Sequence, residues 1–134
     1  MAPSVHDNYI ISYEVHCEKR TILLRTEYRE HDKVIEFTNV YFEEVVAYHF
    51  DNDAFGNIIF DLNEAALEGF LKDYGPEILE LSRMNGRPTW AADLASAPEY
   101  LREQGIKAFL LSASLGLAGW ILARKMSILP ANTP

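Results

Sequence analysis

The acids and the glycine in the segment Asp51-Asn52-Asp53-Ala54-Phe55-Gly56 have types and spacing that could bind an ion. Oxygen ligands at alternating positions, followed by a glycine at the bend, open a calcium-binding loop. The fifth position here is Phe55 and the twelfth is Leu62, where such a loop needs an oxygen ligand and a bidentate glutamate. We therefore interpret the segment as a turn.

His49 and Asp51 share one face of a predicted strand and offer two metal ligands. Zinc sites need at least three protein ligands, and no spacing in the sequence supplies the third. The sequence also lacks the glycine-rich loop that binds the phosphates of a nucleotide cofactor. Gly116 and Gly119 are accompanied by neither a third glycine nor a following helix. The sequence predicts neither a bound metal nor a cofactor.

Nucleophilic catalysis would need a serine, threonine or cysteine beside a base. Cys17 and His16 alternate along one predicted strand, so they point to opposite faces and cannot act as a pair. Cys17 falls on the apolar face, where we expect a buried and inert thiol. The remaining histidines, His6, His31 and His49, belong to no catalytic motif. We predict no catalytic residues and therefore a protein that is not an enzyme.

Charge is the strongest signal in the composition. Twelve Lys and Arg residues against twenty Asp and Glu give a net charge of −8, which repels nucleic-acid phosphate. The range Glu43–Glu80 holds ten acids and one base, Lys72, and therefore a net charge of −9. This range is either a solvated face or the binding surface for a basic partner, which would offset its self-repulsion. The predicted partner-binding residues are Asp51, Asp53, Asp61, Glu64 and Glu68.

Those residues must be positioned by a turn and a helix. Asp51, Asp53 and Asp61 border the turn, while Glu64 and Glu68 have the i, i+4 spacing of one helix face. The five form one patch if the turn and the helix lie side by side.

The N-terminal half of the chain has the pattern of an antiparallel sheet. Apolar residues alternate with polar ones from Tyr9 to Cys17 and from Ile22 to Tyr28, which is typical of half-buried strands. Three further β-rich runs follow at Val34–Tyr41, Glu44–Phe50 and Ile58–Phe60. We predict a meander of five strands that the last run closes.

Two or three helices are predicted between Glu64 and Gln104. Asp61 or Asn63 can cap the first helix, which ends at Gly75-Pro76. Pro76 can begin a second helix that runs to Gly86. Ser96 as cap and Gly105 as C-terminal stop delimit the last.

The apolar runs Ile106–Ser112 and Gly119–Ile128 are separated by turn residues and favour a C-terminal β-hairpin, although a helix stays open there.

With 134 residues, 49% of them hydrophobic, the chain is expected to form a single α+β domain over residues 1–134, with flexible ends at 1–6 and 130–134. A single cysteine and the lack of a signal peptide favour the cytoplasm. The least polar stretch, Ala108–Ala123, is too short to span a bilayer. The oligomeric state is not predicted.

Two parts of the sequence, Glu36–Phe50 with its continuation Phe60–Glu64, and Gly105–Ser112, resemble small uncharacterised bacterial proteins. That group includes the immunity proteins encoded beside secreted polymorphic or contact-dependent toxins. The resemblance implies a cytoplasmic protein that binds and blocks a cognate toxin, often through acidic residues placed against a basic active site. The alternative hypothesis is a small-molecule-binding or accessory domain that uses the concave sheet face with its Tyr and Trp residues.

Overall fold

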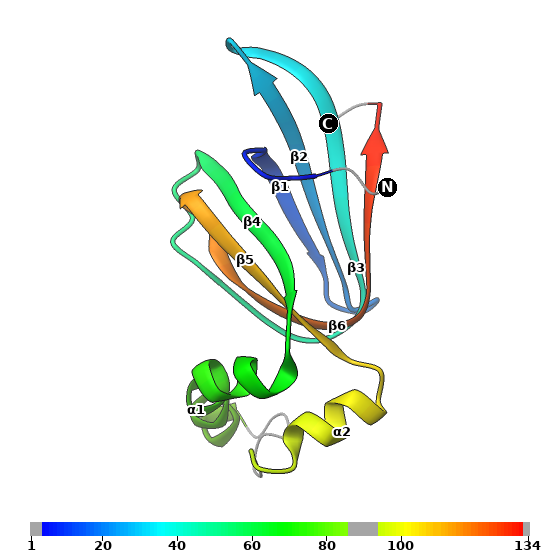
Figure 1. Cartoon of the computed structure of the whole chain (residues 1–134), viewed down its shortest axis with the longest axis vertical. Coiled ribbons are helices and arrows are strands. Elements are labelled where there is room, and N and C mark those ends of the chain that lie inside the picture. The colour runs from blue at the N-terminus through cyan, green and yellow to red at the C-terminus, as the bar shows by residue number, and fades with distance from the viewer. Residues whose placement is uncertain (1–3, 86–93, 133–134) are drawn as a thin grey trace.

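The computed structural model describes residues 4–85 and 94–132, which form an antiparallel barrel with helices packed at one end (Figure 1). The six strands close in the order β1-β2-β3-β6-β5-β4, and β5 and β6 form the predicted C-terminal hairpin. The α+β class is therefore confirmed. The elements are β1 (Tyr9–His16), β2 (Thr21–Glu30), β3 (Lys33–Asp51), β4 (Asn57–Ala65), α1 (Leu67–Asn85), α2 (Ala97–Glu103), β5 (Lys107–Leu115) and β6 (Ala118–Ala131).

The long strand β3 joins the two halves of the barrel. It pairs with β6 from Phe37 to Asp51, but β2 accompanies it only as far as Phe42. A bulge follows, where Glu44 has a φ of 53° and the register shifts between Val45 and Ala47. The prediction of two separate strands was wrong here, because a polar bulge has the same sequence pattern as a polar turn.

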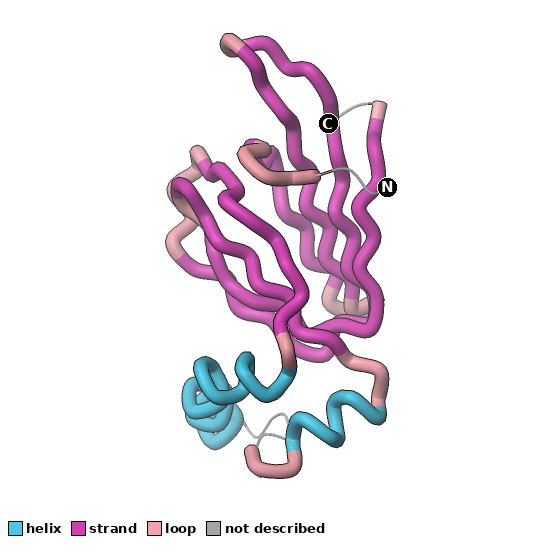
Figure 2. Tube along the Cα trace, in the orientation of Figure 1, coloured by secondary structure: helices cyan, strands magenta, loops and turns pink. Residues whose placement is uncertain are grey.

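The predicted meander ends after β3, because β4 pairs with β5 and β1 and does not pair with β3. Its ladder with β1 consists of Tyr9↔Ile58 and Ile10↔Asn57, so the barrel is closed by a short seam. Figure 2 shows the two layers of strands diverging from each other.

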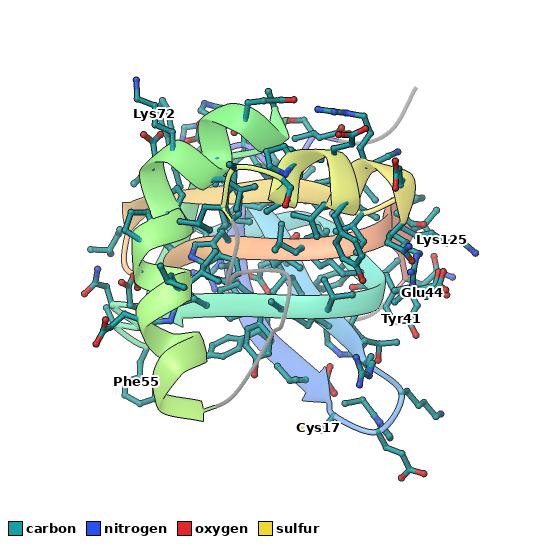
Figure 3. All side chains as sticks on the ribbon, turned by 90° about the horizontal axis from the view of Figure 1, so that it is seen from below. Cys17, Tyr41, Glu44, Phe55, Lys72 and Lys125 are labelled. Atoms are coloured by element: carbon teal, nitrogen blue, oxygen red, sulfur yellow. The ribbon has the colours of Figure 1, made fainter. Side chains whose placement is uncertain are left out.

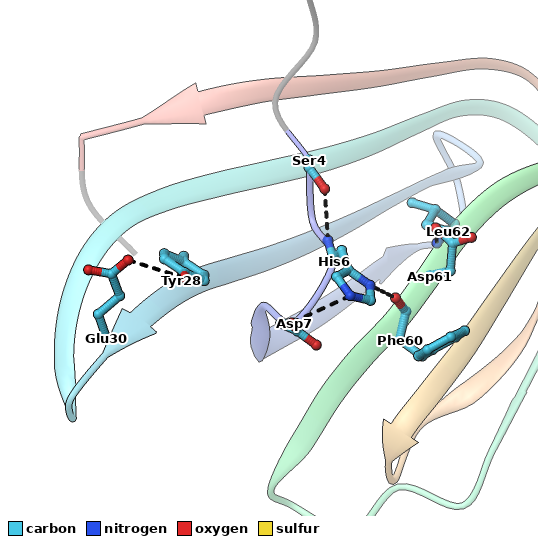
Figure 4. Close-up of polar contacts among 8 residues, drawn as sticks. All are labelled: Ser4, His6, Asp7, Tyr28, Glu30, Phe60, Asp61 and Leu62. Carbon is cyan, nitrogen blue, oxygen red and sulfur yellow. Dashed lines mark hydrogen bonds and ion pairs between the residues drawn. The ribbon is translucent and has the colours of Figure 1, made fainter.

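The N-terminal segment reinforces this seam. The Asp7 N–H donates to the Ile59 carbonyl at 2.8 Å, and the Ile59 N–H donates to the Asn8 carbonyl at 2.9 Å. Val5 is buried in the barrel core, and Figure 4 shows His6 bonded through Nδ1 to the Phe60 carbonyl. At the other end of the chain, residues 130 and 131 belong to β6. Val5, His6 and residues 130–131 therefore contribute to the barrel where the sequence indicated loose segments, and residues 1–3, 133 and 134 lie outside the described part of the chain.

The start and the middle of α1 differ from the prediction. Asp61 and Asn63 do not cap the helix, because β4 extends to Ala65 and α1 begins at Leu67. Pro76 lies inside the helix and does not separate two helices. An interior proline costs about 3 kcal/mol, which burial of apolar side chains on both sides of it can offset. In residues 4–85 and 94–132 the structure thus has two helices, while the predicted helix end at Gly86 lies outside the described residues. Helix α2 begins after Ser96 and ends before Gly105, whose φ is 73°, as predicted. Within the described part of the chain, neither helix is long and apolar enough to cross a membrane.

Strands β5 and β6 are buried on both faces next to the helices. Ile121 and Ala123 belong to the core inside the barrel, whereas Trp120 and Leu122 belong to a second core between the outer sheet face and the helices. This explains why residues 119–123 read as one continuous apolar run. The principal helix side chains of the second core are Phe70, Leu71, Ile78 and Leu101.

Asn57 joins the β3–β4 loop to the β5–β6 turn. Its Oδ1 accepts the N–H groups of Ala54 at 3.0 Å and Leu117 at 2.9 Å, and its Nδ2 donates to Asp53 at 2.9 Å. Gly116 has a φ of 86°, and a Cβ at that position would lie 2.0 Å from Oδ1 of Asn57. A side chain there is therefore excluded both by the backbone conformation and by contact. We call this arrangement the loop joint.

Replacing Asn57 with Ala should lower the free energy of unfolding by about 3 kcal/mol, because buried backbone donors lose their acceptor. Urea unfolding followed by circular dichroism measures this change. Asn63→Ala, an exposed position on the same strand, should change stability by less than about 0.5 kcal/mol. Equal losses in the two variants would show that the loop joint has no special importance.

Candidate functional site

The predicted partner-binding acids do not all line one hollow. Glu64 and Glu68 line a hollow of about 330 Å³ at the β4–α1 junction, together with Arg102 and Lys107. Glu64 lies in β4, so the predicted helical i, i+4 pair is wrong. Glu68 forms an ion pair with Arg102, and hydrogen bonds from its own backbone and from Arg102 lower the pKa of its carboxyl. Basic neighbours therefore compensate the charge of this pair of acids.

Asp53 organises the β3–β4 loop. Its Oδ2 accepts the hydroxyl of Tyr13 at 2.7 Å, and its Oδ1 accepts the Phe55 N–H at 2.8 Å and the Asn57 amide at 2.9 Å. These bonds, with that from Asn57 the largest, lower the pKa of the Asp53 carboxyl. Asp53 is thus engaged within the chain, and its first role is to shape the loop.

The lowered pKa of Asp53 gives stability a pH dependence with a definite sign. The contribution is present above the ordinary aspartate pKa near 3.8 and is lost as the pH falls through the lower folded-state pKa. Asp53→Asn should therefore reduce the loss of stability on acidification, and Tyr13→Phe should reduce it by a smaller amount. Urea unfolding between about pH 2 and 6 tests this expectation. Parallel curves for both variants and the parent protein would contradict it.

Asp51 borders a second hollow, which we call the acidic recess. It has a volume of about 340 Å³ on the outer face of the β3–β6–β5 sheet and is bounded by α1. Nε2 of His49 lies 3.7 Å from Oδ2 of Asp51 and 3.8 Å from Oε1 of Glu77. In the described parts of the chain, neither carboxylate meets a Lys or Arg, and each is at least half exposed. The recess therefore presents two negative charges that only a histidine accompanies.

Aromatic rings form part of the walls of the recess. Tyr74 of α1 lines it, and His49 stacks on Trp120 with ring centroids 6.3 Å apart. Phe70 meets the Trp120 ring edge-on at 5.4 Å and fixes its position beneath α1. Carboxylates beside aromatic faces suit a guanidinium or ammonium group, which gains charge-assisted hydrogen bonds and cation–π contact.

Sequence reasoning found part of the acidic recess and missed the rest. His49 and Asp51 were identified together, as incomplete metal ligands. Tyr74 and Glu77 were missed because the predicted helix break at Gly75-Pro76 put them on different elements. Asp61 lies in β4, opposite Ser112 of β5, which lines the recess.

Phe55 stands at the tip of the β3–β4 loop, four residues after Asp51, and is 97% exposed. Its φ of 62° is a left-handed conformation that costs a bulky residue about 1 kcal/mol or more. Asp53 and the loop joint hold the loop in this shape. The chain therefore keeps a large apolar ring in water on a rigid and strained support. The sequence pointed to Phe55 only as the residue that excludes a calcium loop.

A third hollow, which we call the turn pocket, lies beside the β1–β2 turn and has a volume of about 430 Å³. It is lined by Val15 of β1, by Arg20 of the turn and by Val46 of β3, and Trp120 lines both this pocket and the acidic recess. Cys17 also lines it and is exposed, so the prediction of a buried thiol was wrong. The reason is that β1 ends at His16, and Cys17 opens the turn.

Among the described residues, no group of three His, Cys, Asp or Glu side chains is arranged to hold a metal ion. No protein-family model, curated protein or solved structure matches the chain. Inferences about function therefore depend on the geometry of the acidic recess, the loop and the turn pocket.

Proposed function

We propose that this chain is a binding protein whose acidic recess receives a Lys or Arg side chain of a basic protein partner. The observation that carries the proposal is the pair Asp51 and Glu77, whose carboxylates converge on His49 without a Lys or Arg among the described residues. Two carboxylates held close together repel each other, and a cation placed between them relieves that repulsion. The aromatic walls of Tyr74 and Trp120 would enclose the aliphatic stem of such a side chain.

Phe55 supplies the apolar part of the proposed binding surface. Burying the ring in a complementary pocket would contribute roughly 2 to 3 kcal/mol, the range expected for a fully buried apolar side chain. Binding energy in protein interfaces concentrates in a few such anchors, while surrounding polar groups provide orientation. Because the loop is rigid before binding, little entropy is lost when it docks.

The resemblance to immunity proteins makes a bacterial toxin domain the first partner to test. Such a partner would be basic, and tight association would keep its active site covered. The negative charge of the chain would speed the encounter between the two proteins. This function needs no catalytic group in the chain itself.

Charge reversal in the acidic recess should slow association with the partner recovered from the native host. The double variant Asp51→Lys and Glu77→Lys should reduce the association rate constant at low salt by about tenfold or more and flatten its salt dependence. Surface plasmon resonance over a series of salt concentrations measures both quantities. The control is Asp32→Lys with Glu36→Lys, an equal change of net charge on the exposed β2–β3 hairpin. Equal slowing by both pairs would mean that only the overall charge matters.

Phe55→Asn should separate binding from stability. Asparagine tolerates the left-handed backbone, so unfolding free energy should stay the same or rise by up to about 1 kcal/mol. The complex should nevertheless dissociate at least about tenfold faster, because the anchor is lost. Ile35→Asn, which removes an apolar side chain 53% exposed on the far hairpin, serves as the binding control. A destabilised Phe55→Asn variant with unchanged dissociation would show that the ring serves the fold.

A further inference from the structure

We propose that the turn pocket binds a small molecule with an apolar body and a carboxylate group. This proposal is independent of the protein partner, because the turn pocket and the acidic recess share only Trp120 among their described lining residues and have opposite chemistry. The sequence left a small-molecule site on the sheet face, with its Tyr and Trp residues, as the alternative hypothesis. The turn pocket gives that site a definite location.

The pocket arises where β3 leaves β2. After the bulge at Glu44, β3 pairs with β6 alone, so its other edge faces the end of β1. One backbone hydrogen bond, from the Val45 N–H to the Arg20 carbonyl at 2.9 Å, ties the turn to β3 at this point. Beyond that bond the two segments separate, and the pocket occupies the space between them. Figure 3 shows Cys17 at the end of β1, where the turn begins.

The body of the pocket is apolar. Val15, Ile22 and Val45 approach from the barrel, and Val46 and Ile78 approach from the side covered by α1. The volume of about 430 Å³ lies in the range of roughly 300 to 1,000 Å³ that is typical of small-molecule sites. Displacing water from such walls favours a ligand with an aliphatic or aromatic body.

The polar groups of the pocket are mainly hydrogen-bond donors. Among the residues that the structure describes, Arg20 makes no ion pair and no carboxylate side chain lines the pocket. Nδ1 of His16 accepts the Lys19 N–H at 3.1 Å, so the neutral ring carries its proton on Nε2. Trp120 is only 3% exposed, and its Nε1 has no hydrogen-bond partner among the described residues.

The unpaired guanidinium of Arg20 selects an anionic oxygen over a neutral one, and its planar fork matches a carboxylate. In a protein of net charge −8, a pocket whose described lining has a cation and no acid is a place where an organic anion can bind. Apolar walls and these donors together define an aliphatic or aromatic carboxylate.

Methyl NMR titration with sodium octanoate, and with octanol as the neutral analogue, tests the proposal on the full chain. Octanoate should cause saturable shifts confined to the Val15, Val45, Val46 and Ile78 methyls and to the Trp120 indole N–H. Arg20→Gln should weaken octanoate binding about tenfold and leave octanol binding unchanged. Lys19→Gln, with the same charge change at a side chain outside the pocket, should keep the octanoate affinity.

A second variant tests the volume of the pocket. Val46→Trp should fill the pocket and abolish the binding of both compounds. If that variant does not fold, Arg20→Gln and Lys19→Gln, which are at exposed turn positions, still show whether octanoate binds in the turn pocket. The proposal would be overturned by shifts scattered over the surface, by octanoate binding to Arg20→Gln as tightly as to the parent, or by equal losses in Arg20→Gln and Lys19→Gln.

Discussion

The packing of α1 on the outer sheet face, with Trp120 between them, is the interaction on which the rest of the structure depends. Trp120 meets Phe70 of the helix and His49 of the neighbouring strand, and its own strand is buried on both faces at this point. This second core adds the apolar burial that a barrel with a short β1–β4 seam needs. The acidic recess and the turn pocket lie at its borders, and Trp120 lines both.

The bulge at Glu44 determines how the two hollows differ. It redirects β3 away from β2, which brings His49 and Asp51 beside α1 and leaves Val46 on an unpaired strand edge. Carboxylates therefore line the acidic recess, and hydrogen-bond donors line the turn pocket. A cation and an organic anion could thus be bound by the same small domain at different borders of one core. The loop joint at Asn57 then holds Phe55 close to the acidic side.

Sequence patterns predicted the elements better than their connections. Alternation located β1 and β2, because one face of each strand meets a core. Continuous apolar runs located the C-terminal hairpin, because its strands are buried on both faces next to the helices. The bulge at Glu44 and the continuous α1 were missed, since a polar pair and a Gly-Pro pair usually end an element. Tertiary burial of Val45 and Ile78 overrode those local signals. Of the predicted binding residues, Asp51 enters the acidic recess, whereas charge pattern alone could not show that Arg102 neutralises Glu68 or that Asp53 shapes its own loop.

We propose that a basic partner docks on the acidic recess and on the loop that carries Phe55. Site-specific photo-crosslinking in the native host tests it most directly, with p-benzoylphenylalanine placed at position 55 or, in a second strain, at position 35 of the distant hairpin. The account predicts that position 55 captures one protein of net positive charge, that Asp51→Lys with Glu77→Lys abolishes the capture, and that position 35 does not capture it. Capture of the same proteins from both positions, or of an acidic protein from position 55, would contradict it.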